Sequence, residues 1–255
     1  MRKLSRSWLL GAGAAVTLLL AGAVAAMTVQ PVAVDLRMAG REASAPIRVE
    51  NNGPNPLPVE VRIVETDFTP DSVRASDRAT DDIIAFPPQA IIPPGGTQVF
   101  RLQYVGDPDG ESSRHYYAEV AQQPVELPEG QSAIQILYNF QVMVNVASII
   151  AGDPQLSLVG SEIATNAEGK PVVAFTMQNT GRNYGYLSQG SLSIRHTNAA
   201  GEETMQRTLA ANDIQQNIGY GLIGPEMSRR FVTAIELESA DGQLEVSYSP
   251  GRGRR

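Results

Sequence analysis

The sequence has no cysteine, and it has only two histidines, His115 and His196. Without cysteine no disulfide can form, so an exported chain of this kind must be stabilised by hydrophobic burial alone. Two histidines that are far apart and have no cysteine nearby do not form a zinc-binding pattern. No serine occurs in a Gly-x-Ser-x-Gly context, and no pair of carboxylates has a recognisable catalytic setting. We therefore expect no metal, no cofactor and no enzymatic activity.

Positive charge is also scarce. The 255 residues carry 20 Lys and Arg against 27 Asp and Glu, which gives a formal net charge of −7. After residue 26 the chain has one lysine, Lys170, and sixteen arginines. A face that binds nucleic acid needs clustered basic residues to neutralise phosphates. This balance argues against nucleic acid as a partner.

The first 26 residues have the pattern of a secretory signal peptide. Arg2, Lys3 and Arg6 precede an uncharged run, residues 7–26, that ends in small residues. The alternative is an uncleaved membrane anchor, because the run is nearly long enough to span a bilayer. Cleavage is favoured since no positively charged stop-transfer cluster follows. We expect residues 1–26 to be removed and the mature chain to have no stable membrane insertion.

From Met27 onward the sequence consists of short alternating segments separated by Gly, Pro and Asn. No stretch of ten or more residues has a sustained helical period. Strand signals that recur about every 8–12 residues are typical of a β-sandwich. The best linker candidate is Ile149–Pro154, which predicts an all-β chain with domains at 27–150 and 151–255. The charged stretch Asp67–Asp82 is expected to be a loop or a frayed edge, and the Gly/Arg-rich end a disordered tail.

One alternating stretch, AIQILYNFQVMVNVAS, is unusually long. Its even positions from Ile134 to Val146 are all large and apolar, and a strand turns alternate side chains to one face. At about 3.3 Å per residue, a strand over 133–148 would exceed the length that a small sandwich core needs. The pattern predicts a connector between two domains, with part of its apolar face available to another molecule.

Several motifs together resemble the periplasmic chaperones of pilus assembly, the chaperone–usher family. In the first half they are IRVENNGPNPLPVEVRI, PPQAIIPPGGTQVFRLQY and YYAEVAQQPVE. In the second half they are MQNTGRNYGYLSQGSLSI, GYGLIGPE and RRFVTAIEL. The resemblance covers essentially the whole chain after the signal peptide. It implies two immunoglobulin-like sandwiches set at an angle, with a pilin or fimbrial subunit held by the first.

The resemblance also implies a mechanism and partners. Such a chaperone lends a strand to a subunit that lacks one, and it delivers the subunit to an outer-membrane usher from the periplasm. The side chains lent here would be Ile134, Ile136, Tyr138 and Phe140, whereas Val142–Val146 would stay in the chaperone's own core.

The chain departs from the family at the residues that usually hold the carboxylate at the subunit's C-terminus. The family uses an arginine on the first strand and a lysine on the long strand, and the corresponding positions here are Ala33 and Met143. A buried carboxylate still requires a charged or hydrogen-bonding partner. The best substitute is Arg101, which alternates with Phe100, Leu102 and Tyr104, and the weaker candidates are Arg37 and Arg114. An ordinary surface role for Arg101 is the alternative.

Two other functions remain open at this stage. The chain could be an exported tandem immunoglobulin-like module with an adhesive or structural role, or a carbohydrate-active sandwich enzyme. The long apolar stretch favours the chaperone over a structural module, because exposed apolar edges promote aggregation.

Overall fold

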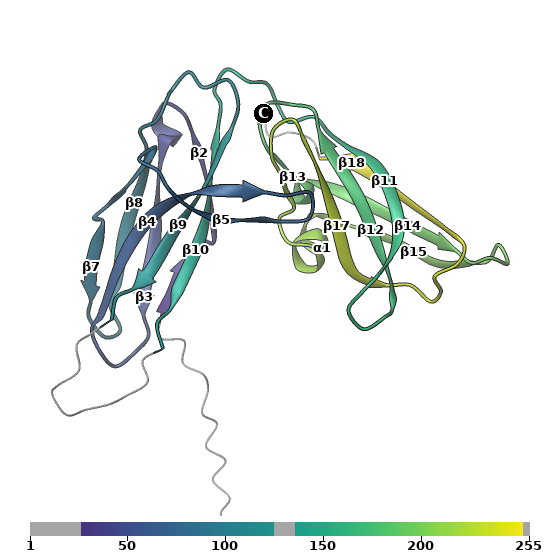
Figure 1. Ribbon diagram of the computed structural model, residues 1–255, viewed down its shortest axis with the longest axis horizontal. Helices are drawn as coiled ribbons and strands as arrows, with labels where there is room; N and C mark the ends of the chain where they lie inside the picture. Colours follow the sequence, from purple (N-terminus) through teal and green to yellow (C-terminus); the bar gives the residue numbers. More distant parts are fainter. Residues whose placement is uncertain (1–26, 125–135, 252–255) are drawn as a thin grey trace, which may run out of the picture.

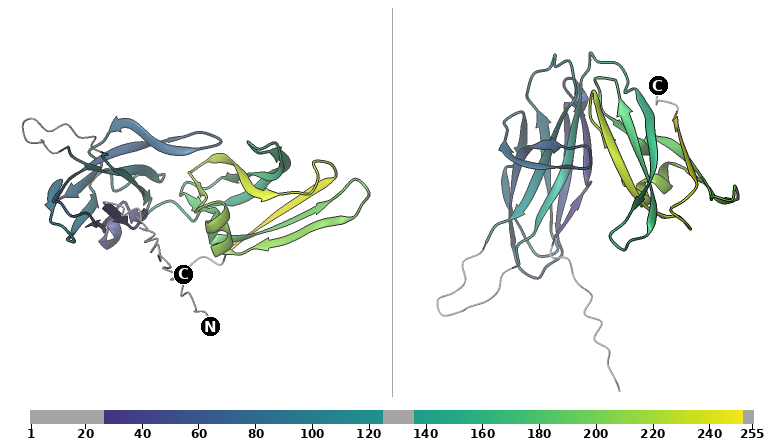
Figure 2. Two further views of the ribbon diagram at one scale, coloured as in Figure 1. Left: turned by 90° about the horizontal axis from the view of Figure 1, so that it is seen from below. Right: turned by 45° about the vertical axis from the view of Figure 1, so that its right-hand side comes forward.

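The computed structural model describes residues 27–124 and 136–251, and nearly all of its regular structure is β-strand (Figure 1). The strands form two sandwiches that meet at one end and diverge at the other (Figure 1 and Figure 2). Each sandwich has its own hydrophobic core, one drawn from residues between Met27 and Val146 and the other from residues between Val173 and Leu237. The prediction of an all-β chain with two immunoglobulin-like sandwiches set at an angle is confirmed.

The first sandwich contains two sheets. Its four-stranded sheet has the order β1 (Met27–Gln30), β3 (Ser44–Asn51), β8 (Thr97–Tyr104) and β6 (Ile83–Phe86). Its second sheet has the order β2 (Ala33–Arg37), β10 (Asn139–Ala147), β9 (Arg114–Gln122), β4 (Leu57–Phe68) and β5 (Val73–Ala79), and β7 (Gln89–Ile92) also pairs with β4. A short 3-10 helix, Arg41–Ala43, precedes β3.

Alternation along the strands explains how this core forms. On β8, Phe100, Leu102 and Tyr104 are buried while Arg101 and Gln103 between them are exposed. Two-residue periodicity places the apolar set of each strand between the sheets and the polar set outside.

The second sandwich is built in the same way. One sheet has the order β11 (Leu156–Thr165), β12 (Pro171–Asn179) and β17 (Met227–Glu236). The other has the order β15 (Glu203–Leu209), β14 (Gly190–Thr197) and β18 (Gln243–Pro250). A short pair, β13 (Gly185–Tyr186) and β16 (Leu222–Ile223), lies beside them, together with the 3-10 helix Leu187–Gln189 and the helix α1 (Ala211–Asn217).

The link between the sandwiches, residues 148–155, belongs to no strand and is held by one buried asparagine of the second sandwich. The backbone N–H of Ser148 donates to Oδ1 of Asn183 at 2.8 Å. The Nδ2 of Asn183 lies 3.1–3.2 Å from the carbonyl oxygens of Ser148, Ala151 and Gly152. These contacts tie the link to the second sandwich on both sides of Ile149.

The hairpin between β4 and β5 also reaches the second sandwich (Figure 1). The backbone N–H of Arg230 on β17 donates to the carbonyl of Pro70 at 2.7 Å. The expectation of a loop or frayed edge over Asp67–Asp82 is therefore wrong in part. Residues 73–79 form β5, an edge strand whose charged, exposed side chains conceal the strand signal in the sequence.

Two further expectations need correction. The strand expected over 133–148 is observed from Asn139 to Ala147, and residues 136–138 before it belong to no strand. The sequence also gave no sign of α1, because seven residues with one buried apolar side chain, Ile214, are too few to show a helical period. Within the described ranges, no helix is long and apolar enough to cross a membrane. The expected signal peptide and the C-terminal tail from 252 onward lie outside the described residues.

Candidate functional site

Strand β10 has two different edges. Along one side it pairs antiparallel with β9 from Asn139 to Val146. Along the other side it pairs parallel with β2, but only from Met143 to Ala147. In the part of the chain that the structure describes, no strand pairs with residues 139–142 on the β2 side. The first half of β10 therefore presents unpaired backbone N–H and C=O groups, which can accept an added strand.

The candidate strand-lending side chains lie along and just before this open edge. Ile136 is 70% exposed, and its neighbour Leu137 is 48% exposed. Tyr138 and Phe140 are half-buried and pack against the first core. Ile134 lies outside the described residues. The structure thus places Ile136 in solvent, and it places Tyr138 and Phe140 partly within the first sandwich itself.

Tyr138 is already attached to β9 although it precedes β10. Its carbonyl accepts a hydrogen bond from the backbone N–H of Gln122 at 2.8 Å. The β9 pairing therefore extends one residue upstream of the regular strand, and the open edge extends with it.

Ala33 and Met143, the two positions that the sequence resemblance aligns with the family's usual cations, are side by side. Ala33 on β2 and Met143 on β10 are partners in the parallel register, and the N–H of Met143 donates to the carbonyl of Val32 at 3.0 Å. The side chains of Ala33 and Met143 alternate along their strands with the buried side chains of Val34, Val142 and Val144. They therefore share the outer face of this sheet. Neither carries a charge, and together they mark the point where the open edge of β10 ends.

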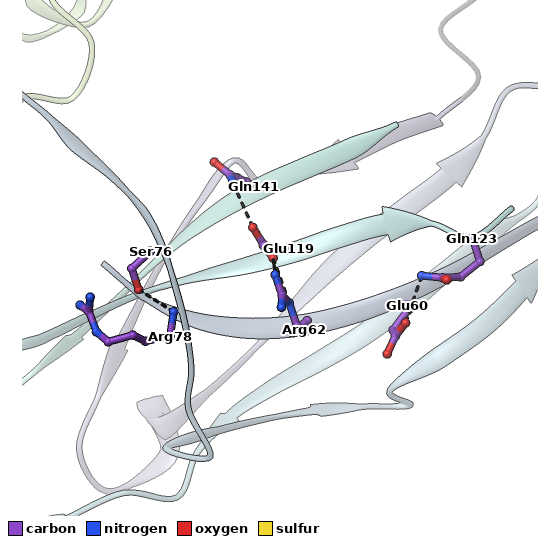
Figure 3. Close-up of polar contacts among 7 residues, drawn as sticks. All are labelled: Glu60, Arg62, Ser76, Arg78, Glu119, Gln123 and Gln141. Atoms are coloured by element: carbon purple, nitrogen blue, oxygen red, sulfur yellow. Dashed lines mark hydrogen bonds and ion pairs between the residues drawn. The ribbon is translucent and has the colours of Figure 1, made fainter. Parts of the chain in front are cut away.

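A charged network lies on the same outer face, one step further from the second sandwich (Figure 3). Oε2 of Glu119 on β9 accepts hydrogen bonds from Arg62 on β4, at 3.1 Å from Nε and 2.7 Å from Nη2. Nε2 of Gln141 on β10 donates to the other carboxylate oxygen at 3.1 Å. The Glu119 side chain is only 10% exposed, and the Arg62 guanidinium satisfies its charge. Arg62 is thus a cation on this face whose charge is already matched.

The three arginines predicted as substitute anchors are not brought together. Arg101 lies on β8 in the other sheet of the sandwich, where it is exposed and donates to Oγ of Ser44 at 2.8 Å. Arg37 is exposed at the end of β2, with Nε 3.5 Å from Glu42. Arg114 at the start of β9 lies 3.2 Å from Asp82. Arg37 and Arg114 flank the C-terminal end of β10, through Ala147 and Val146, rather than its open half.

The face that carries Ala33 and Met143 continues into a polar cluster between the two sandwiches. Oδ1 of Asp35 on β2 accepts hydrogen bonds from the hydroxyls of Tyr184 at 2.9 Å and Tyr186 at 2.5 Å. Nδ2 of the buried Asn145 donates to the Tyr186 oxygen at 2.6 Å. Burial and the neighbouring Asp35 carboxylate raise the pKa of both tyrosines. Both phenols are therefore neutral hydrogen-bond donors at physiological pH.

His115 completes this cluster. Its Nδ1 lies 2.7 Å from Oδ1 of Asn145, and its ring packs edge-on against Phe68 and Tyr184. Burial lowers its pKa to about 4. A neutral histidine can be packed here at little electrostatic cost, whereas a charged one cannot.

This cluster could hardly be predicted from the sequence. The Tyr184–Leu187 segment contributes to the core of the second sandwich through Leu187, which is fully buried. Tyr184 and Tyr186 instead reach Asp35, 149 and 151 residues away in the chain. Only the pairing of β2 with β10, which brings Asp35 beside Asn145, places the acceptor there. Among the described residues no group of three or more metal-ligating side chains occurs.

No protein-family model matches the chain, and no curated protein matches it. Solved structures do match. The structure of the Salmonella enterica SafA pilin in complex with the SafB chaperone contains a chain that aligns over 88% of this chain and 95% of its own length, with a TM-score of 0.51 and 11% identity. The YadV chaperone aligns over 88% of this chain and 92% of its own length, with a TM-score of 0.50 and 15% identity.

At this level of identity the likeness establishes the fold. The chain has the two-domain fold of these chaperones. The resemblance to chaperones of pilus assembly that the sequence indicated is confirmed at the level of the fold, and the low identity agrees with a divergent member.

Proposed function

We propose that this protein is a periplasmic chaperone of pilus assembly that stabilises pilin-like subunits by donor-strand complementation and delivers them to an outer-membrane usher. The observation that carries the proposal is the divided edge of β10. Its second half is covered by β2, whereas its first half, residues 139–142, has a partner on one side only. An incomplete sandwich could add a strand to this half and receive the side chains that precede and line it.

The energetics of the edge support the same proposal. Ile136 and Leu137 are largely exposed, and moving such side chains from water into an apolar groove contributes roughly 1.5–3 kcal/mol each. Tyr138 and Phe140 are half-buried and would complete their burial in the same groove. The added backbone hydrogen bonds would satisfy the open edges of both proteins and fix the register.

The fixed geometry between the sandwiches supports the function in a second way. Tyr184, Tyr186 and Asn183 of the second sandwich bind Asp35 and the link 148–152. A constant angle between the sandwiches would then keep the ordering cost of binding on the chaperone side small. The SafB chaperone, which shares the fold, is in complex with a pilin.

A paired capture experiment tests the proposal. The wild-type chain and an Ile136→Asp variant are expressed with an affinity tag in the periplasm, and proteins that co-purify are identified by mass spectrometry. We expect the wild type to retain a small β-rich subunit that the variant loses, because the variant would bury an unpaired charge. Ile84→Asp is the matched control, since Ile84 is 53% exposed on β6 in the other sheet. Equal capture by wild type and the Ile136 variant would contradict strand lending.

A further inference from the structure

The open half of β10 exposes the backbone groups of Asn139 and Gln141. The carbonyl of Tyr138 accepts a hydrogen bond from Gln122 on β9, whereas the N–H of Met143 donates to Val32 on the opposite side of β10. Successive residues of a strand turn their backbone groups to opposite edges. At every second residue before Met143, the N–H and C=O groups therefore point toward the open edge, and these residues are Gln141 and Asn139.

The side chains of the same two residues lie on the outer face of the sheet. Both are exposed, and they alternate with the half-buried Phe140 and the buried Val142. In the observed register Asn139 lies beside Ala121 of β9, and Ala121 lies beside Glu60 of β4. These three residues form a row across the sheet that starts at the open edge.

A hollow of about 300 Å³ lies on this outer face. We call it the polar hollow, and it is lined by Glu60, Arg62, Glu119, Ala121, Gln123 and Asn139. Ala121 has the smallest side chain of the row and lies between the longer side chains of Asn139 and Glu60. The polar hollow therefore extends from β4 to a residue that forms the open edge itself.

The Glu60 carboxylate leaves the polar hollow with negative charge. The guanidinium of Arg62 is paired with Glu119 at 2.7 Å, as Figure 3 shows. Glu60 is exposed, and its Oε2 accepts a hydrogen bond from Nε2 of Gln123 at 3.0 Å. Within the described residues, no salt bridge involves Glu60. One carboxylate on this face is thus held by a neutral amide alone.

The neighbouring strand β5 does not compensate this charge. The hydrogen bond and the charge of Glu119 raise the pKa of Arg62 most, and the carboxylates of Asp77 and Glu60 raise it further. Arg78 of β5 is already paired with two carboxylates of β4, at 2.6 and 2.8 Å. A second cation that entered the polar hollow would therefore be attracted by it.

We propose that the polar hollow binds the charged end of a lysine or arginine side chain on the outward face of the polypeptide that adds to the open half of β10. The inference rests on the proposed function and deepens it. It assigns to the outer face of the bound strand a preference for a basic residue.

The geometry of an added strand favours a long side chain. Every second residue of such a strand faces outward, beside Asn139 or Gln141. Neighbouring strands are about 4.8 Å apart, so Ala121 lies roughly two such spacings from the added strand. The apolar stems of lysine and arginine can lie over Asn139 and place the charged end at the polar hollow, whereas shorter side chains end beside Asn139.

Four capped synthetic peptides test the site. All share one soluble sequence of alternating apolar and polar residues, and three of them differ only at one central polar position, which is lysine, glutamine or glutamate. The fourth has glutamine at the centre and a lysine at its end, beyond the alternating part, so its net charge equals that of the central-lysine peptide. Isothermal titration calorimetry measures their binding to the wild-type chain at low ionic strength.

We expect the central-lysine peptide to bind about threefold to fivefold more tightly than both the glutamine peptide and the end-lysine peptide, which is the range of an exposed ion pair. The glutamate peptide should bind most weakly. The preference for central lysine should decrease as salt is added, because the groups are exposed to solvent. The end-lysine peptide separates a local site from the general attraction of a cation to an acidic protein.

Variants then assign the preference to residues. Glu60→Gln should abolish it, and Glu60→Lys should reverse it, so that the glutamate peptide binds more tightly than the central-lysine peptide. Ala121→Leu should abolish it by filling the polar hollow while Glu60 stays in place. Glu50→Gln is the matched control, because Glu50 lies on β3 in the other sheet and its loss changes the net charge equally. Circular dichroism establishes that each variant is folded.

The two hypotheses fail in different ways. Equal affinity of the central-lysine and end-lysine peptides for the wild type, or an undiminished preference in Glu60→Gln, would overturn the basic-residue site and leave strand addition standing. If none of the peptides bound the wild type, strand addition itself would be contradicted.

Discussion

The Tyr184 hydroxyl donates a hydrogen bond to Oδ1 of Asp35 at 2.9 Å, although the two residues are 149 positions apart and belong to different sandwiches. The bond lies beside the shorter contact of Tyr186 with the same oxygen and the contact of Tyr186 with Asn145. One carboxylate oxygen of the first sandwich therefore fixes two phenols of the second. The linker alone would not define the angle between the sandwiches.

Removing both hydroxyls should loosen this angle. In the double variant Tyr184→Phe/Tyr186→Phe, the Asp35 carboxylate loses two donors, and we expect a loss of about 1–3 kcal/mol in the free energy of unfolding. Small-angle scattering should fit one angle for the wild type and require a range of angles for the variant. Tyr220→Phe is the control, because Tyr220 is 44% exposed and packs beside Tyr186 without a hydroxyl hydrogen bond in the described structure. A wild type that itself required a broad range of angles would contradict a fixed geometry.

The stability of the chain should fall between neutral and acidic pH because of His115. In the unfolded chain this histidine protonates near its ordinary pKa of 6.5, whereas burial lowers the pKa to about 4 in the folded state. The unfolded state therefore binds more protons between these values, so the contribution is complete above pH 6.5 and is lost as the pH falls toward 4. The loss amounts to about 3 kcal/mol over this window. Asp35, Asn145 and Tyr184 surround the ring.

Urea titrations at several pH values measure this dependence. His115→Gln keeps a polar group beside Asn145 but cannot protonate, so its stability should change less than that of the wild type between pH 6.5 and 4. Identical pH dependence of the two proteins would show that His115 is not the group responsible.

Phe140 should contribute both to the fold and to binding. It is half-buried against the first core, so Phe140→Ala should lower the free energy of unfolding by about 1–3 kcal/mol. The largely exposed Ile136, in contrast, should tolerate Ile136→Ala within about 0.5 kcal/mol. Chemical denaturation of both variants makes the comparison. An Ile136 variant that unfolded as readily as the Phe140 variant would place Ile136 in the core.

Arg101→Ala tests the anchor that the sequence favoured. Arg101 is exposed on β8, with Ser44 as its hydrogen-bond partner, so we expect less than about 0.5 kcal/mol of change in subunit capture. A loss of about 2–5 kcal/mol, the cost of removing one member of a buried ion pair, would restore Arg101 as the anchor. Binding of the captured subunit at constant salt provides the measurement.

The sequence predicted the class of fold because that information is local. Alternation on β8 and β10 and the repeated turn residues indicate sandwiches without any knowledge of contacts. It also paired Ala33 with Met143, and the two are neighbours in the observed register; their correspondence to the family's anchor positions stays a prediction.

The contacts between the sandwiches could not be predicted in this way. The partners of Asp35 and His115 come from elements far apart in the chain, and no periodic pattern encodes which elements become neighbours. The β5 strand was missed for a different reason. Its outward side chains are charged, as is common for edge strands, and charge conceals the alternation.

The divided edge of β10 separates the residues that stabilise the first sandwich from the residues that leave a backbone edge open. Residues 143–147 are fixed between β2 and β9, so they contribute to the stability of the first sandwich whether or not a partner is present. Residues 136–142 have one side open, and their exposed members Ile136, Leu137, Asn139 and Gln141 can change with little effect on folding, whereas Val142 is buried in the first core and Tyr138 and Phe140 pack against it. Substitutions at the exposed positions upstream of Met143 therefore reshape the open edge while the scaffold stays constant.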